Sequence, residues 1–242
     1  MNAYRYLAQA YNKLMSDVDY DAWASYINLL LEKKELRLFE ASCGTGNITT
    51  RLYDFGHNII ASDISSEMLD IAIKDARQNG RDIVYVQQDM RQISAGNKFD
   101  AVLSTCDGPN YIDKDGLQDF ISAAYHMLKP GGKLLFDVSS YHKLSSMDNE
   151  VYYDDGEDAT CIWHNHFDFA LNKLTMDVVL FIRRGEMFEK LTEQHVQYAH
   201  KKEDVEKALI NSGFCQIDVY EAFKKEPVSL KTARLQFVCL KD

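Results

Sequence analysis

Short apolar runs alternate with amphipathic segments of helical period through the first 140 residues of this chain. The apolar runs expected to form strands cover residues 36–41, 58–62, 83–87, 101–104 and 133–137. The helical period is clearest where Leu117, Phe120, Ile121, Ala124 and Leu128 fall on one face. Strands that alternate with helices indicate a mostly parallel sheet with helices on both faces, because right-handed crossovers leave few other topologies. The sequence therefore predicts a doubly wound α/β fold.

The pattern changes after residue 140. Residues 151–198 resemble strands separated by turns, and every second residue from Leu174 to Ile182 is apolar. This pattern predicts an antiparallel β insertion with one face packed on the main domain, since a small sheet needs a partner for its apolar face. The helical period returns from Lys202 to Gly213, and two last strands are expected at residues 215–220 and 234–240.

We therefore expect three parts in the chain. They are residues 1–140 with two N-terminal helices and the core, residues 141–200 with the insertion, and residues 201–242 with the last helix and strands. The N-terminal helices break near Asp17–Asp19. Ser65 is a plausible N-cap for a helix that ends at Gly80, and Asp115 with Gln118 resembles a capping box.

Composition restricts the partners of the chain. The formal net charge is −10 and the basic doublets are scattered among acids, which disfavours a nucleic-acid partner without excluding one. The five cysteines have no close pairs, so they suggest neither a disulfide framework nor a zinc site. No apolar run approaches the roughly 20 residues that span a bilayer, and the N-terminus lacks the pattern of a secretory signal. We expect no membrane partner and a cytoplasmic location; the oligomeric state cannot be predicted.

The turn after the first expected strand, Glu40–Gly46, carries the strongest functional signal. Its glycines let a ligand approach the backbone, and the N-terminus of the following helix offers free amides. Asp63 lies 19 residues after Gly44 at the end of the second strand, where an acid accepts ribose hydroxyls. Asp89 ends the third strand and can accept from an adenine amino group. The dinucleotide fingerprint fails at Thr49, which predicts an adenosine with a zwitterionic tail rather than a pyrophosphate.

These motifs resemble, in order and spacing, those of class I S-adenosylmethionine (SAM)-dependent methyltransferases. The likeness covers most of the chain and is strongest to small YqeM-like bacterial methyltransferases, and it is also similar to small-molecule N-methyltransferases. The segments that carry it are Tyr11–Met15, Asp19–Trp23, Glu40–Gly46, Asp63, Gln88-Asp89, Thr105–Tyr111 and Leu128–Gly132. The resemblance implies a Rossmann-like seven-stranded sheet with its last strand antiparallel, and an insertion that acts as a lid over the acceptor.

The resemblance also implies which residues bind SAM. Glu40 and the backbone of the glycine-rich turn would hold the methionine moiety, Asp63 the ribose, and Asp89 the adenine amino group between Ile64 and Met90. Thr105 and Cys106 would lie beneath the sulfonium. The full expected set is Tyr20, Trp23, Glu40, Ala41, Ser42, Cys43, Gly44, Gly46, Asp63, Ile64, Met68, Gln88, Asp89, Met90, Thr105 and Cys106. Ser42 replaces the usual first glycine, so a small residue is expected to suffice there.

Three residues are candidates for catalysis. Tyr11 resembles the tyrosine that covers the methyl group in related N-methyltransferases, although packing between helices is an alternative. Asp107 would open towards the acceptor, and His142 follows the fifth strand at a position suited to a general base. Cys106 is not expected to be a nucleophile, because Asp107 beside it would not lower the thiol pKa.

A metal site is not expected. His164 and His166 share a strand face, but the further donors that a metal requires are missing at suitable spacing.

We therefore expect an enzyme that transfers the SAM methyl group to an N or O acceptor, with a small molecule as the first hypothesis. An RNA- or protein-modifying methyltransferase is the second hypothesis, and a non-catalytic SAM-binding regulator is the third. The sequence does not name the acceptor.

Overall fold

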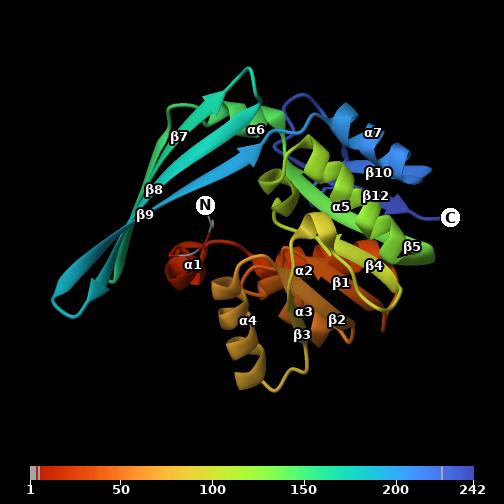
Figure 1. The fold of residues 1–242 in the computed structure, drawn as a ribbon, viewed down its shortest axis with the longest axis horizontal. Helices are drawn as coiled ribbons and strands as arrows, with labels where there is room; N and C mark the ends of the chain where they lie inside the picture. Colours follow the sequence, from red (N-terminus) through yellow and green to blue (C-terminus); the bar gives the residue numbers. More distant parts are fainter. Residues whose placement is uncertain (1–3, 5, 225) are drawn as a thin grey trace.

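The computed structural model describes residues 4, 6–224 and 226–242. Its main sheet has the strand order β11-β10-β12-β5-β4-β1-β2-β3 (Figure 1). The strands are β1 (Arg37–Ala41), β2 (Asn58–Asp63), β3 (Val84–Gln87), β4 (Phe99–Ser104), β5 (Leu128–Ser139), β10 (Gln216–Glu221), β11 (Glu226–Pro227) and β12 (Arg234–Leu240). Strand β12 runs antiparallel to both β5 and β10. The predicted fold is confirmed, and the two-residue strand β11 adds an edge that the sequence did not predict.

Helices cover both faces of the main sheet. They are α2 (Tyr20–Leu31), α3 (Asn47–Asp54), α4 (Ser66–Gln78), α5 (Lys114–Met127) and α7 (Lys202–Ser212), with short 3₁₀ helices η1 (Met90–Gln92) and η2 (Gly108–Tyr111). Helix α1 (Ala8–Leu14) instead packs against the insertion through Tyr11 and Leu14. Apolar residues of α2, α3 and α4 pack on one face of the sheet, whereas those of α5 and α7 pack on the other. Because β1 to β4 are parallel, their carboxyl ends lie along the same edge of the sheet, as in other doubly wound sheets.

Local sequence explains most helix starts. Ser65 caps α4 and accepts from the Met68 amide, as expected. Helix α5 starts one residue before the expected cap: Asp113, rather than Asp115, is the N-cap and accepts from the Gly116 amide. The expected capping box is therefore wrong, since the true cap lies two residues upstream.

The insertion, residues 141–200, forms a separate antiparallel sheet that extends away from the main sheet (Figure 1). It comprises a short helix, α6 (Tyr141–Ser146), and the strands β6 (Val151–Asp155), β7 (Ala159–Asp168), β8 (Lys173–Arg184) and β9 (Met187–Tyr198). Every second residue of β8 from Leu174 to Ile182 is buried, as the sequence predicted. These residues form a cluster with Leu7, which lies just before α1, and with Leu144 of α6. The apolar face thus packs on those two elements rather than on the helices of the main sheet.

None of the helices in the described part of the chain is long and apolar enough to cross a membrane.

Candidate active site

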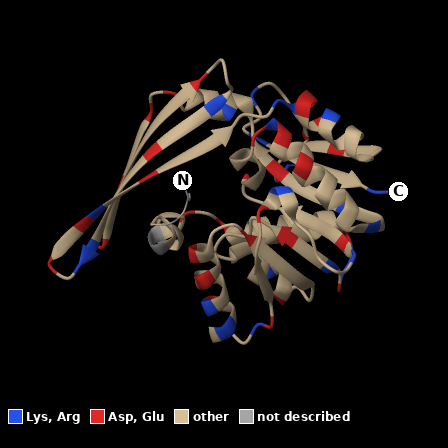
Figure 2. Cartoon of the chain, viewed as in Figure 1, with Lys and Arg blue, Asp and Glu red and all other residues tan. Residues whose placement is uncertain are grey.

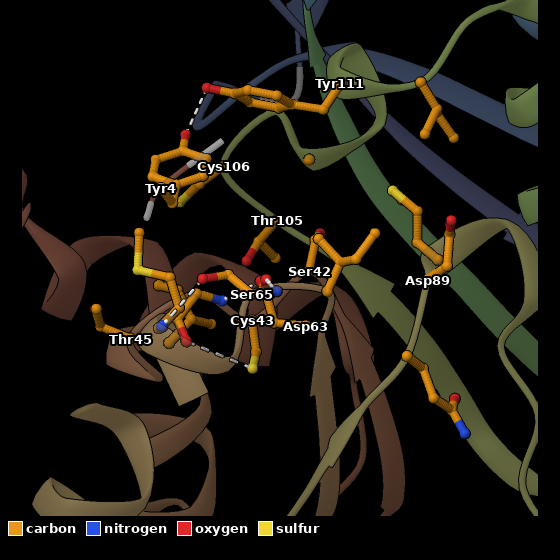
Figure 3. A pocket seen from close by; sticks show the side chains of 18 of the residues that line it. Tyr4, Ser42, Cys43, Thr45, Asp63, Ser65, Asp89, Thr105, Cys106 and Tyr111 are labelled. Atoms are coloured by element: carbon orange, nitrogen blue, oxygen red, sulfur yellow. Dashed lines mark hydrogen bonds between the residues drawn. The ribbon is translucent and has the colours of Figure 1, made fainter. Parts of the chain in front are cut away.

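A cavity of about 340 Å³ opens at the ends of the first four strands. Ser42, Asp63, Gln88 and Thr105, each of which directly follows or ends one of these strands, all line it (Figure 3). Parallel strands place their carboxyl ends along one edge, which is how residues far apart in sequence come to share this cavity. Its volume lies in the range of small-molecule sites.

The glycine-rich turn adopts left-handed backbone conformations at three positions. The φ angles of Ser42, Gly44 and Gly46 are 54°, 55° and 78°. At Gly46 a Cβ would lie 2.9 Å from the Tyr85 hydroxyl, whereas at Gly44 it would meet no atom within 4 Å. Gly46 is therefore required by packing and Gly44 faces open space on the cavity wall. Ser42 tolerates this conformation while its hydroxyl lies 2.8 Å from Ser104 Oγ and donates to the Ala41 carbonyl.

Asp63 connects the turn to the next helix. Its Oδ2 accepts from the Gly44 amide at 2.8 Å and its Oδ1 from the Ser65 amide at 2.9 Å. Burial raises the pKa of Asp63, although the two amide hydrogen bonds oppose this rise. The carboxylate is fixed on the cavity wall with unshared lone pairs, so it can accept further hydrogen bonds from a ligand hydroxyl.

Glu40 lies directly behind the wall. Its side chain is buried; Oε2 accepts from the Thr49 hydroxyl at 2.6 Å and Oε1 from the Thr105 hydroxyl at 3.4 Å. Burial raises the pKa of Glu40 to about 7, and the charge of Asp63 adds to this rise. Thr105, which donates to Glu40, also lines the cavity. Only this side chain therefore separates the cavity from the Glu40 carboxyl group, which has no cationic partner in the described part of the chain. A cationic ligand group at this point would lower the cost of ionising Glu40.

The residues after β3 form another wall of the cavity. Asp89 makes an ion pair with Arg91, and the pKa of Asp89 is lowered by this hydrogen-bonded partner. The Gln88 side chain bonds the backbone of Ser94 through both its nitrogen and its oxygen. Both side chains therefore have protein partners, and each keeps lone pairs or N–H groups that a ligand in the cavity could use.

The floor of the cavity is a strained turn. Cys106 and Asp107 have φ angles of 57° and 56°, a conformation that costs a non-glycine residue about 1–2 kcal/mol. Burial raises the pKa of the Cys106 thiol, which agrees with the expectation that it is no nucleophile. Asp107 does not line the cavity: its carboxylate accepts from Ser139 Oγ at 3.2 Å and Gln197 Nε2 at 3.1 Å, and pairs with Arg234 at 3.4 Å.

Five tyrosines line the rest of the cavity. They are Tyr4, which precedes α1, Tyr11 of α1, Tyr20 of α2, Tyr111 of η2 and Tyr198 of β9. The Tyr4 and Tyr111 hydroxyls hydrogen bond to each other (Figure 3). Burial raises the pKa of Tyr11 well above its usual range and that of Tyr20 to about 12, so both phenols are neutral at physiological pH.

Most of the predicted residues share this cavity. Its walls include Tyr11, Tyr20, Ser42, Cys43, Gly44, Asp63, Ile64, Met68, Gln88, Asp89, Met90, Thr105 and Cys106. Glu40, Ala41 and Gly46 belong to the same turn but lie behind the wall. Tyr4 and Tyr198 carry no signal in the sequence, and Tyr111 belongs only to the Thr105–Tyr111 motif. The binding and catalytic roles of the expected residues stay predictions.

Three further expected residues, Trp23, His142 and Asp107, do not line the cavity. Asp107 pairs with Arg234, as described above. Trp23 is buried in the core against Phe223, with ring centroids 4.4 Å apart, and the Arg234 guanidinium lies 5.4 Å from its ring. His142 is exposed on α6 and does not line the cavity.

No group of three metal-binding side chains occurs in the described part of the chain. His166 instead lies 3.6 Å from the Asp148 carboxylate.

This geometry agrees with the similarity of the chain to known proteins. Residues 39–132 match the family described as a methyltransferase domain. Over 242 residues the chain is 33% identical to the putative methyltransferase YqeM of Bacillus subtilis (strain 168), covering 99% of this chain and 97% of the relative. The chain belongs to the SAM-dependent methyltransferases. The structure of such an enzyme from Clostridium acetobutylicum ATCC 824 superposes with a TM-score of 0.87 at 31% identity, over 99% of both chains.

A more distant relative of this methyltransferase is the glycine/sarcosine N-methyltransferase of Halorhodospira halochloris. The two are 25% identical over 222 residues, which cover 86% of this chain and 78% of the relative.

The cavity fits SAM on structural grounds. Gly44 leaves space where a side chain would stand, and Asp63 presents a carboxylate at the end of β2. The buried carboxyl of Glu40 accepts from the Thr49 and Thr105 hydroxyls and pairs with no cationic side chain in the described part of the chain. An adenosine that carries a positively charged amino-acid tail supplies hydroxyls for the first acid and an ammonium for the second.

Proposed function

We propose that this methyltransferase transfers the SAM methyl group to the nitrogen of a small amine. The observation that carries the proposal is the wall of five tyrosines that lines the cavity beyond the glycine-rich turn. SAM, when bound, supplies an electrophilic methyl group on a positively charged sulfur. Aromatic faces and neutral phenol oxygens stabilise positive charge, and an amine acceptor becomes positively charged as it is methylated.

The placement of the acid–base candidates favours nitrogen over oxygen. An alcohol acceptor requires a base to take its proton, whereas an amine that arrives neutral does not. Asp107 points to Arg234 and Gln197, and His142 is exposed outside the cavity. The residues of this chain would therefore act by orientation: they align acceptor and methyl group and exclude water.

Different residues of the cavity would bind different parts of SAM and of the acceptor. Asp63 and the turn at Gly44 would bind the ribose and the methionine tail, with Glu40 opposite its ammonium group. Tyr11 and Tyr111 would border the acceptor nitrogen. The 25% identical glycine/sarcosine N-methyltransferase supports an amine acceptor.

A polymeric acceptor finds less support. Lys and Arg are spread among Asp and Glu over both sheets (Figure 2), and the net charge is −10. RNA would need a continuous basic surface to neutralise its phosphates. The enclosed, tyrosine-lined cavity also favours a compact acceptor over a polymer side chain.

A panel of small amines, the matched alcohols and carboxylates, and unmodified tRNA tests the proposal with SAM labelled in its methyl group. We expect label in amines only. Tyr111→Phe should reduce this transfer while SAM affinity is retained, whereas Tyr153→Phe, on the exposed strand β6, should change neither. Preferred labelling of an alcohol or of tRNA would overturn the proposal.

A further inference from the structure

The insertion contains a buried carboxyl–imidazole pair for which methyl transfer has no direct use. Glu193 and His195, two residues apart on β9, have side chains that are only 4% and 2% exposed, and their Oε2 and Nε2 atoms lie 3.1 Å apart. Burying a carboxylate and a polar ring is costly unless their remaining hydrogen-bonding capacity is satisfied. The partners that satisfy these side chains therefore indicate what the pair does.

Those partners are in the N-terminal segment, which we define as the described residues from Tyr4 to Leu14. The second oxygen of Glu193 accepts from the backbone amides of Tyr6 and, at 3.2 Å, of Leu7. The His195 ring packs edge-on against Tyr4 with ring centroids 4.7 Å apart. These hydrogen bonds, with that of His195, lower the pKa of Glu193 despite its burial, so it is charged at neutral pH.

The segment held in this way forms part of the cavity wall. Tyr4 and Tyr11 both line it, and the Tyr4 hydroxyl reaches across to that of Tyr111 on η2. The insertion also contributes Tyr198, five residues after Glu193 on the same strand. One strand thus both supplies a wall residue and anchors a cover that comes from the opposite end of the sequence.

We propose that Glu193 and His195 are positioning residues that anchor the N-terminal segment on the insertion, so that Tyr4 and Tyr11 close over bound SAM. Neither residue touches the reacting atoms; both act through the tyrosines of the cover. SAM can leave only when the amides of Tyr6 and Leu7 separate from Glu193. The inference rests on the cavity of the proposed function being the SAM site.

The test measures SAM dissociation and the hydrogen exchange of the N-terminal amides in the full-length protein. Glu193→Gln keeps the shape of the side chain and removes its charge. We expect SAM to dissociate about ten- to a hundredfold faster, as the loss of hydrogen bonds to a charged group would give, and the Tyr6 and Leu7 amides to exchange faster. Glu189→Gln, on the same strand with an exposed side chain paired to Arg184, is the matched control and should behave as the wild type.

A second variant separates positioning from stability. In Glu193→Leu/His195→Leu the buried pair is replaced by apolar side chains, a change that often leaves stability equal or higher. We expect a folded protein with a melting temperature close to that of the wild type, because the amides of Tyr6 and Leu7 can bond water once the segment is released. This protein should nevertheless release SAM faster. SAM dissociation at the wild-type rate in both variants would overturn the inference. Failure of the wild type to bind SAM would instead count against the cavity assignment itself, so the two failures are distinguishable.

Discussion

We expect single side chains at the strand ends to account for SAM recognition. Asp63 combines a fixed position, through the amides of Gly44 and Ser65, with free lone pairs on the cavity wall. Asp63→Ala should weaken SAM binding by about 1–3 kcal/mol, since a charge-assisted acceptor is lost. Calorimetry measures this change, with Asp70→Ala on the exposed face of α4 as the control. Unchanged affinity in Asp63→Ala would assign the ribose to another residue.

Glu40 carries a proton that we expect it to release when SAM binds. With a pKa raised to about 7 by burial, Glu40 is largely protonated at pH 6. An ammonium group bound beside it favours the carboxylate and lowers this pKa. Binding at pH 6 should therefore release a proton, detected as a dependence of the calorimetric enthalpy on the ionisation enthalpy of the buffer. Glu40→Gln should abolish that dependence, and equal proton release by both proteins would contradict the role.

The same pKa has a consequence for stability without SAM. The folded-state pKa of Glu40 lies above its unfolded value of 4.5. The folded state binds this proton more tightly than the unfolded state, and the stabilisation that results is fully present below about pH 4.5. This stabilisation is lost as the pH rises towards 7, by about 1.4 kcal/mol per pH unit within that window. Denaturant titrations of wild type and Glu40→Gln should show the wild-type free energy of unfolding falling more steeply across this range. Parallel curves would show that Glu40 titrates normally.

Two neighbouring elements, the glycine-rich turn and η2, meet at a contact that requires glycine. A Cβ at Gly108 would lie 2.1 Å from Ser42 Oγ and 2.8 Å from Ser104 Oγ. Gly108→Ala should destabilise the fold by about 1–3 kcal/mol through overpacking. Ser42→Gly removes the nearer atom and also suits the positive φ of that position, so the double variant should recover much of the loss.

Denaturant titrations of the four proteins measure this coupling, and Gly96→Ala is the control, since its Cβ would meet no atom within 4 Å. Additive effects of the two substitutions would show that Ser42 and Gly108 do not compete for this space.

Elements with a local sequence signal were predictable, and contacts between distant elements were not. The positions of Asp63, at the end of β2, and of Asp89, two residues after β3, follow from apolar runs and turns that lie within a few residues of them. The orientation of Asp107, in contrast, depends on Arg234, which is 127 residues away and shows no local pattern. Tyr4 could not be predicted for the same reason, because only the fold brings it to Tyr111. Helix α6 is too short to give a helical period.

At the scale of the whole molecule, the main sheet and the insertion contribute different parts of the cavity, and the two meet at η2. The main sheet supplies the walls expected to bind SAM, whereas the insertion supplies Tyr198 and anchors the N-terminal segment. Asn110 joins the two: its side-chain amide donates to the carbonyls of Ser139 at 3.1 Å and Tyr198 at 2.8 Å. The beginning and the end of the insertion therefore lie within reach of a single side chain.

That closeness allows the insertion to be removed cleanly. Residues 141–200 can be replaced by a short glycine-serine linker, and no strand of the main sheet loses a pairing partner, since the two sheets are separate. SAM binding should persist, weakened by the loss of the anchor at Glu193, because Asp63 and the glycine-rich turn remain. Methyl transfer should be abolished, because the acceptor loses Tyr198 and the cover that excludes water. Calorimetry with SAM and transfer of labelled methyl to the preferred amine measure the two effects. Transfer at the full-length rate would show that the insertion is no lid and that the N-terminal helices alone select the acceptor.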